Sequence, residues 1–192
     1  MASFNIHLAI AKRYIFKNQV SNIDDFYRGT IEPDLKEYEN KLHYTDVNRN
    51  RNDILSYLKG KTNLSRFLSE NDINNDYNKG VFLHLITDYL FFNDFFDIKY
   101  IKNITYEDFV KDLHFSYYYT NSYIKNKYNI SYGIYEDEIN KNISNDKKEK
   151  NTLDNIGNNI LEFEKLDSFI ERVSDINLEH YKDKILNNLI YN

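Results

Sequence analysis

The stretch from Gly80 to Phe92 constrains this chain most strongly, because it is apolar on every face of a helix apart from one histidine, one threonine and one aspartate. A helix that is hydrophobic all round is usually central and buried. His84 and Asp88 are four positions apart, so a helix places their side chains one above the other on one face. Burying both groups costs free energy unless each is paired or bound to metal. We therefore predict a buried central helix over about residues 74–96, in which His84 and Asp88 bind one ion.

Gly80 lies one helical turn before His84, where it costs about 1 kcal/mol relative to alanine. Such a glycine indicates that another helix packs closely against this point. We expect this neighbour to be the N-terminal helix, which begins after Ser3 and carries His7 on its apolar face. A buried histidine is often satisfied by a backbone carbonyl, so His7 is either a core residue of that kind or a metal ligand.

Turn-forming residues are scarce in this chain, since its 192 residues include one proline and five glycines. This scarcity favours helices over a fold of many short strands. The length suits one well-buried domain and leaves little room for a second. We therefore predict an all-α fold, a single-domain helical bundle over residues 1–192. A polar, low-complexity stretch near residues 136–152 is expected to be a flexible connection.

The composition excludes several classes of protein. The chain has no cysteine, so a metal ion must be held by histidine, carboxylate, carbonyl or water rather than by thiolate. A formal net charge of −5 argues against extended binding to nucleic acid or to an anionic membrane. The apolar run from Val81 to Phe96 is too short to be a transmembrane segment, and the N-terminus does not resemble a signal peptide. We expect a cytoplasmic protein, and the sequence leaves its oligomeric state open.

Two further candidate ligands lie between the N-terminal and central helices. Asp34 directly follows Pro33, and a side chain at such a turn can point inward from irregular backbone. His43 comes just after the short helix expected over about residues 34–41. Taken alone, Asp34 is more simply a turn or helix-capping residue and His43 a surface residue. Together with the candidates above, they form a mixed set of imidazoles and carboxylates, which suits zinc or another first-row divalent ion.

His114 is the remaining candidate, and it falls within a long predicted helix. Thr105 and Asp108 form a capping box, so this helix should begin after Thr105 and continue to about Tyr128. His114 lies beside the tyrosine-rich run Tyr117–Tyr119. It is either hydrogen-bonded to a phenol or a carboxylate, or it is a metal ligand, and the sequence leaves both interpretations open.

Four short segments follow one another in the first half of the chain. They are Asn5–Ala11, Gly29–Leu35, His43–Thr45 and Gly80–Asp88. The second contains Gly-x-x-x-Pro-Asp and the fourth contains His-x-x-x-Asp. In this ordered set the chain resembles the zinc-dependent phospholipase C family, an all-helical group that shares its fold and metal site with the S1/P1 nucleases.

The resemblance implies a role for each predicted ligand. Asp34, His43, His84 and Asp88 would bind one ion, and Asp88 would also bridge to a second ion bound by His7. The expected cofactor is therefore one or two zinc ions, or another first-row divalent metal. The family also implies a metal-activated water that attacks phosphorus. Asp34 or Asp88 would be the catalytic residue that accepts a proton from this water.

The chain departs from the family pattern at the other metal positions. Secreted members complete the second site with an N-terminal tryptophan, and this chain contains no tryptophan. They bind a third ion through a histidine soon after the bridging aspartate and through a His-x-x-x-Glu pair. Here the first of these positions falls near Asn93 and Asp94, and Tyr118 takes the place of the glutamate after His114. His114 is the candidate replacement ligand.

The expected function is hydrolysis of a small phosphoester by a metal-dependent enzyme similar to zinc-dependent phospholipase C. Two alternatives stay open. A related phosphodiesterase or nuclease would use the same metal site on nucleotides. A non-catalytic, metal-binding helical protein would account for the incomplete second and third sites.

Overall fold

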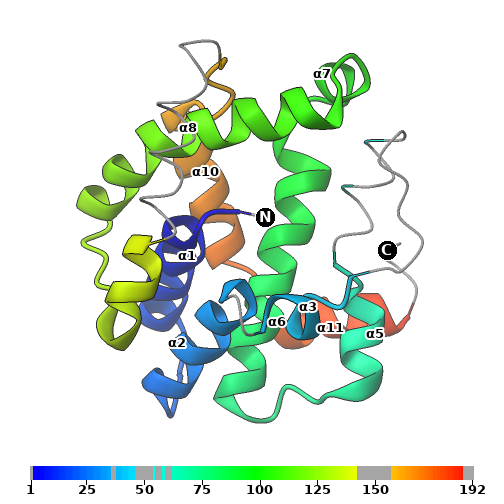
Figure 1. Cartoon of the computed structure of the whole chain (residues 1–192). Coiled ribbons are helices and arrows are strands. Elements are labelled where there is room, and N and C mark those ends of the chain that lie inside the picture. The colour runs from blue at the N-terminus through cyan, green and yellow to red at the C-terminus, as the bar shows by residue number, and fades with distance from the viewer. Residues whose placement is uncertain are drawn as a thin grey trace.

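Within the residues that the structure describes, all regular elements are helical (Figure 1). The computed structural model describes residues 2–35, 38–45, 54, 58, 62–141 and 157–187. The α-helices are α1 (Phe4–Lys17), α2 (Ile23–Ile31), α3 (Glu39–Leu42), α5 (Leu64–Glu70), α6 (Asp76–Leu90), α7 (Ile98–Lys102), α8 (Tyr106–Lys127), α10 (Phe163–Ser174) and α11 (Leu178–Leu186). Shorter elements are the 3-10 helices Glu32–Asp34 and Gly133–Tyr135 and the π-helix Phe91–Phe95. The predicted all-α fold is confirmed.

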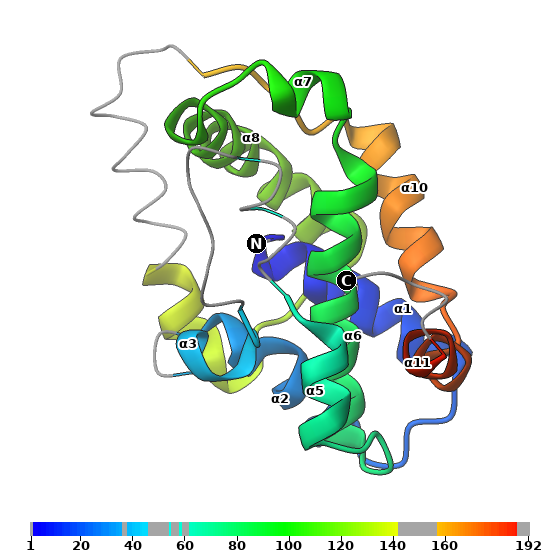
Figure 2. The ribbon, with the colours of Figure 1, turned by 90° about the vertical axis from the view of Figure 1, so that its right-hand side faces the viewer.

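Helix α6 passes through the middle of the molecule in both views (Figures 1 and 2). The Asn75 side chain caps its start by accepting a hydrogen bond from the backbone N–H of Asn78. Every residue from Val81 to Asp88 is at most 1 % exposed, as the apolar sequence predicts. The prediction of one helix over about 74–96 was wrong at its end, because the backbone widens into a π-helix at Phe91–Phe95. Rings of this turn pack on Phe169 of α10.

Helices α2 and α6 approach each other closely in the core, and each contributes a glycine at the point of contact. A Cβ atom on Gly80 would lie 2.2 Å from the carbonyl oxygen of Phe26, and one on Gly29 would lie 2.0 Å from that of Tyr77. The predicted close packing at Gly80 is therefore confirmed. The expectation that the neighbour is the helix carrying His7 was wrong. Helix α1 contains no glycine, whereas α2 offers Gly29 at the crossing.

The other helices surround this pair. Helix α1 begins after Ser3, as predicted, although the Ser3 side chain makes no capping hydrogen bond. This helix packs against α2, α8 and α10. The predicted N-cap of α8 is confirmed, since Thr105 Oγ1 accepts from the Asp108 N–H at 3.1 Å; it also donates to the Asp108 carboxylate at 2.8 Å. Within the described part of the chain, no helix has both the length and the apolar character needed to cross a bilayer.

Two predicted segments are described only in part. Of the expected connection near residues 136–152, residues 136–141 are helical and the remainder lies outside the described residues. The short helix expected over about 34–41 begins later, at Glu39, because residues 32–34 continue from α2 as a 3-10 helix. His43 directly follows α3, as predicted.

The close approach of α2 and α6 predicts that Gly80→Ala destabilises the fold. Overpacking against a backbone costs about 3 kcal/mol and alanine recovers about 1 kcal/mol of helix propensity, so we expect a net loss of about 2 kcal/mol. Chemical denaturation measures this free energy of unfolding. Gly133→Ala is the control, because Gly133 has a φ of 55° and open space around it. Alanine at this position should cost about 1 kcal/mol, which comes only from its left-handed backbone conformation. A smaller loss at Gly80 than at Gly133 would contradict the packing.

Candidate metal centre

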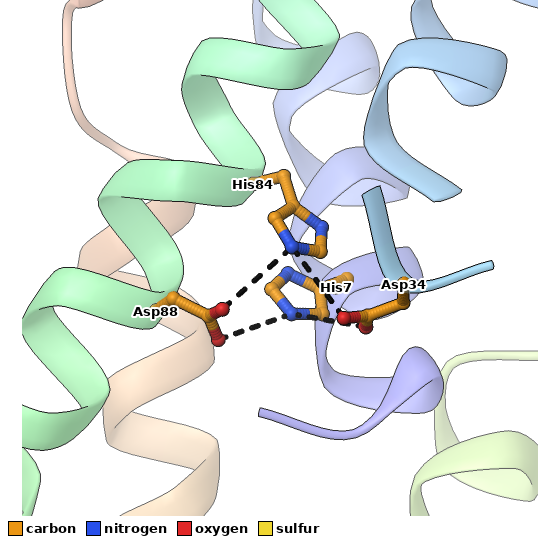
Figure 3. Close-up of side chains that lie close together, drawn as sticks. All are labelled: His7, Asp34, His84 and Asp88. Carbon is orange, nitrogen blue, oxygen red and sulfur yellow. Dashed lines mark ion pairs between the residues drawn. The ribbon is translucent and has the colours of Figure 1, made fainter. Parts of the chain in front are cut away.

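Five of the six predicted metal ligands come together in the core. His7 lies near the start of α1, and His84 and Asp88 lie on α6. Asp34 ends the 3-10 helix that continues α2, and His43 follows α3. All five side chains are 0–4 % exposed. Figure 3 shows the two carboxylates pointing from opposite sides toward the stacked rings of His7 and His84, whose centroids are 3.8 Å apart.

Four donor atoms surround one point. His43 Nε2 lies 3.2 Å from Asp34 Oδ1 and 3.3 Å from His84 Nε2. His84 Nε2 lies 3.7 Å from Asp34 Oδ1, and Asp88 Oδ2 lies 3.7 Å from both His43 Nε2 and His84 Nε2. Zinc bonds of about 2.0–2.1 Å in a tetrahedron place ligand atoms about 3.4 Å from one another. The spacing of these four atoms therefore suits one tetrahedral ion.

The second oxygen of each carboxylate faces His7. His7 Nε2 lies 3.4 Å from Asp88 Oδ1 and 3.7 Å from Asp34 Oδ2. Asp88 Oδ1 also accepts the backbone N–H of Ala2 at 2.7 Å, and both ribbon views place the N-terminal end of the described chain beside α6. The two carboxylates are thus shared by a His43–His84 group and a His7 group. Sequence reasoning implied this shared position for Asp88 and missed it for Asp34, because the choice of oxygen depends on rotamer.

A backbone carbonyl orients His84. The Thr30 carbonyl oxygen lies 2.8 Å from His84 Nδ1 and can only accept, so Nδ1 carries the proton and Nε2 keeps its lone pair toward the carboxylates. Burial, together with the adjacent His7 ring, lowers the pKa of His84 from 6.5 to about 3, so the ring is neutral at pH 7. Sequence reasoning missed Thr30 because any residue supplies a carbonyl.

Both aspartates are ionised in the core. Burial raises the pKa of the Asp34 carboxyl, but the imidazoles around it, His84 first among them, outweigh this effect and hold its pKa below the ordinary value. The pKa of Asp88 is held well below its ordinary value against burial, mainly by the His7 ring. Asp88 Oδ2 and both ring nitrogens of His7 are buried without a hydrogen-bond partner. Two buried anions with uncommitted donor atoms beside them fit a divalent cation, so the group could hold a metal ion.

The donors that all lie within 4.8 Å of one another are His7, Asp34, His84 and Asp88, and His43 joins this group through its contacts with Asp34 and His84. The sixth predicted ligand, His114, is not in the group. His114 is partly buried on α8, and its ring meets the Tyr117 ring edge to face, with centroids 6.4 Å apart. Its ligand role stays a prediction. Asp94, near which the resemblance places a third-site ligand, forms an ion pair with Arg172 at 3.0 Å.

A cavity of about 460 Å³ lies between α1, α2 and residues 129–135. Its lining includes Leu8, Ile31 and three tyrosines, Tyr27, Tyr132 and Tyr135. The described residues that line it include none of the five clustered ligands. The cavity is therefore a separate feature, and the candidate metal centre does not depend on it.

Comparisons with models of known protein families, with curated proteins and with solved structures found no match to this chain. The candidate site therefore rests on the donor geometry of the chain itself.

Asp88→Asn is expected to lower metal affinity at least about tenfold, because it removes one negative charge shared by both donor groups while nearly preserving volume. Elemental analysis of protein purified without added metal, followed by titration with Zn²⁺, measures this change. Asp183→Asn, an exposed position on α11, and His180→Ala are the controls and should retain the parent metal content. Equal metal content in Asp88→Asn and both controls would place the site elsewhere.

Proposed function

We propose that this protein is a metal-dependent hydrolase of phosphoesters, with one or two zinc ions or another first-row divalent metal as cofactor. The observation that supports this proposal is the position of Asp34 and Asp88, each of which turns one oxygen toward His43 and His84 and the other toward His7. Carboxylates shared in this way are suited to bridge two adjacent ions, as two-metal phosphatases and nucleases require.

The proposed ligands divide into two sets. Asp34, His43, His84 and Asp88 would hold the first ion, as the resemblance to zinc-dependent phospholipase C implies. His7 and the second oxygens of the two aspartates would hold the second. Three protein donors leave coordination positions for water or substrate. When bound, such ions supply Lewis acidity toward a phosphoryl oxygen and acidify water.

The chain's own groups would mainly provide fixed charge and orientation. Asp34 and Asp88 keep two negative charges in the core, and the Thr30 carbonyl keeps the Nε2 lone pair of His84 available. A carboxylate with a lowered pKa is a weak proton acceptor. Acceptance of the water's proton by Asp34 or Asp88 would therefore contribute less than their charge does.

A small phosphoester is the proposed substrate. The phosphoester class comes from the four ordered segments that resemble zinc-dependent phospholipase C. The net charge of −5 disfavours long nucleic acids, because binding a polyanion depends on clustered positive charge. Nucleotides remain compatible with the charge, so the related nucleotide phosphodiesterase is the nearest variant of this proposal.

A non-catalytic metal site is the second candidate, and burial favours it. All five donor side chains are at most 4 % exposed, which is typical of a closed structural site. Both the hydrolase and the non-catalytic site would bind metal, but only the hydrolase would turn over a phosphoester.

Turnover of phosphoesters decides between these candidates. We expect the metal-loaded protein to hydrolyse at least one chromogenic phosphomonoester or phosphodiester in a panel tested at several pH values, and we expect Asp34→Asn to abolish this activity. Asp183→Asn is the matched control and should keep it. Bound metal with no turnover across the panel would support the non-catalytic site, and a protein that binds no divalent metal would refute both.

His7→Ala tests the second ion. Because the carboxylate atoms that His7 Nε2 approaches are the second oxygens of the two aspartates, we expect zinc stoichiometry to fall from two ions to one while the tighter site remains. Isothermal titration and elemental analysis measure this change, with His180→Ala as control. Loss of all bound zinc in His7→Ala, or one ion in the parent protein, would show a single-ion centre instead.

A further inference from the structure

Tyr44 has a backbone conformation that side chains rarely adopt, and it directly follows a proposed ligand. Its φ is 52°, in the left-handed region. Glycine adopts this region readily and asparagine or aspartate occasionally, whereas it is sterically unfavourable for tyrosine. Such residues cluster at functional sites and persist where the surrounding structure determines them. The preceding residue is His43, whose Nε2 lies 3.2 Å from Asp34 Oδ1 and 3.3 Å from His84 Nε2.

Contacts with α5 and its two ends hold Tyr44 in this conformation. Its ring meets the fully buried Phe67 ring edge to face, with centroids 5.3 Å apart and planes at 88°. The Asn71 side-chain amide donates to the Tyr44 hydroxyl at 2.7 Å. The backbone N–H of Asn63 donates to the Tyr44 carbonyl at 3.1 Å. Ring, hydroxyl and carbonyl are therefore all fixed against one helix.

The same helix is packed onto the element that bears the other ligands. The Phe67 ring stacks on Phe82 of α6, with centroids 5.6 Å apart and planes at 8°. Phe82 lies two residues before His84. A continuous set of rings thus connects the backbone at Tyr44 to the helix that carries His84 and Asp88.

His43 needs such an anchor more than the other ligands do. His7, His84 and Asp88 lie within helices of 14 and 15 residues, and Asp34 continues from α2. His43 follows α3, which has four residues. A short helix has few hydrogen bonds to define its direction. If residue 44 relaxed to negative φ while its carbonyl stayed on Asn63, the chain before it would turn away and His43 would leave the donor group.

We propose that Tyr44 is the positioning residue of the metal centre, acting through its left-handed backbone and its anchorage on α5 to direct His43 at the ion. The inference rests on the proposed metal centre and deepens it, because it makes α5 part of the apparatus that retains the first ion. In this role Tyr44 acts through His43 and is not itself a ligand.

The test is a double-mutant cycle in Zn²⁺ affinity. Tyr44→Ala is expected to weaken zinc binding tenfold or more in the parent protein and less than twofold in a His43→Ala background, where there is no imidazole left to position. Tyr44→Phe, which keeps the ring on Phe67, should restore most of the affinity. Tyr100→Ala is the control, since Tyr100 is a part-buried tyrosine hydrogen-bonded to Asp112 and its loss should leave zinc affinity unchanged.

Imidazole nitrogen spectra give a second readout that general unfolding would not produce. In zinc-loaded Tyr44→Ala, the Nε2 signal of His43 should move to its metal-free position while that of His84 stays shifted. Equal weakening in both backgrounds, or simultaneous release of both histidines, would overturn the positioning role and indicate ordinary packing. If His43→Ala alone leaves zinc affinity unchanged, the ligand set of the proposed centre is wrong as well.

Discussion

Two ionised carboxylates in the core are the constraint on which the rest of this structure depends. Asp34 and Asp88 are essentially removed from water, and a buried charge is tolerated only when partners compensate it. Three imidazoles and the backbone N–H of Ala2 surround them. Two buried carboxylates with imidazole nitrogens beside them are suited to a divalent cation, and this is the physical reason that the cluster could hold one.

The helices meet this constraint through contacts that lie behind the ligands. The glycines of α2 and α6 allow the two backbones to touch, and this contact brings the Thr30 carbonyl within 2.8 Å of His84 Nδ1. The contact between α2 and α6 also places Asp34 opposite Asp88, because Asp34 ends the 3-10 helix that follows α2. Tyr44 and α5 perform a comparable task for His43. Precise donor placement therefore depends on residues that bind nothing themselves.

Much of the fold could be predicted because its signals are local. The apolar run after Gly80 indicated a buried helix, and Thr105 with Asp108 located the start of α8. The π-helix after Leu90 could not be predicted, since its backbone widens where several phenylalanine rings pack on one another and on α10. The neighbour of Gly80 was assigned to the wrong helix because a glycine shows that a close contact exists but not which element makes it.

The sequence by itself determined the types and the order of the candidate ligands, since helical spacing places His84 above Asp88 and the ordered segments add His7, Asp34 and His43. Tertiary structure alone decided which of these atoms face each other. The two oxygens of Asp34, the Nδ1 proton of His84 and the left-handed backbone of Tyr44 all depend on neighbours distant along the chain. Local sequence specifies which groups are available, whereas their convergence on a shared point follows from the packing of α1, α2, α5 and α6.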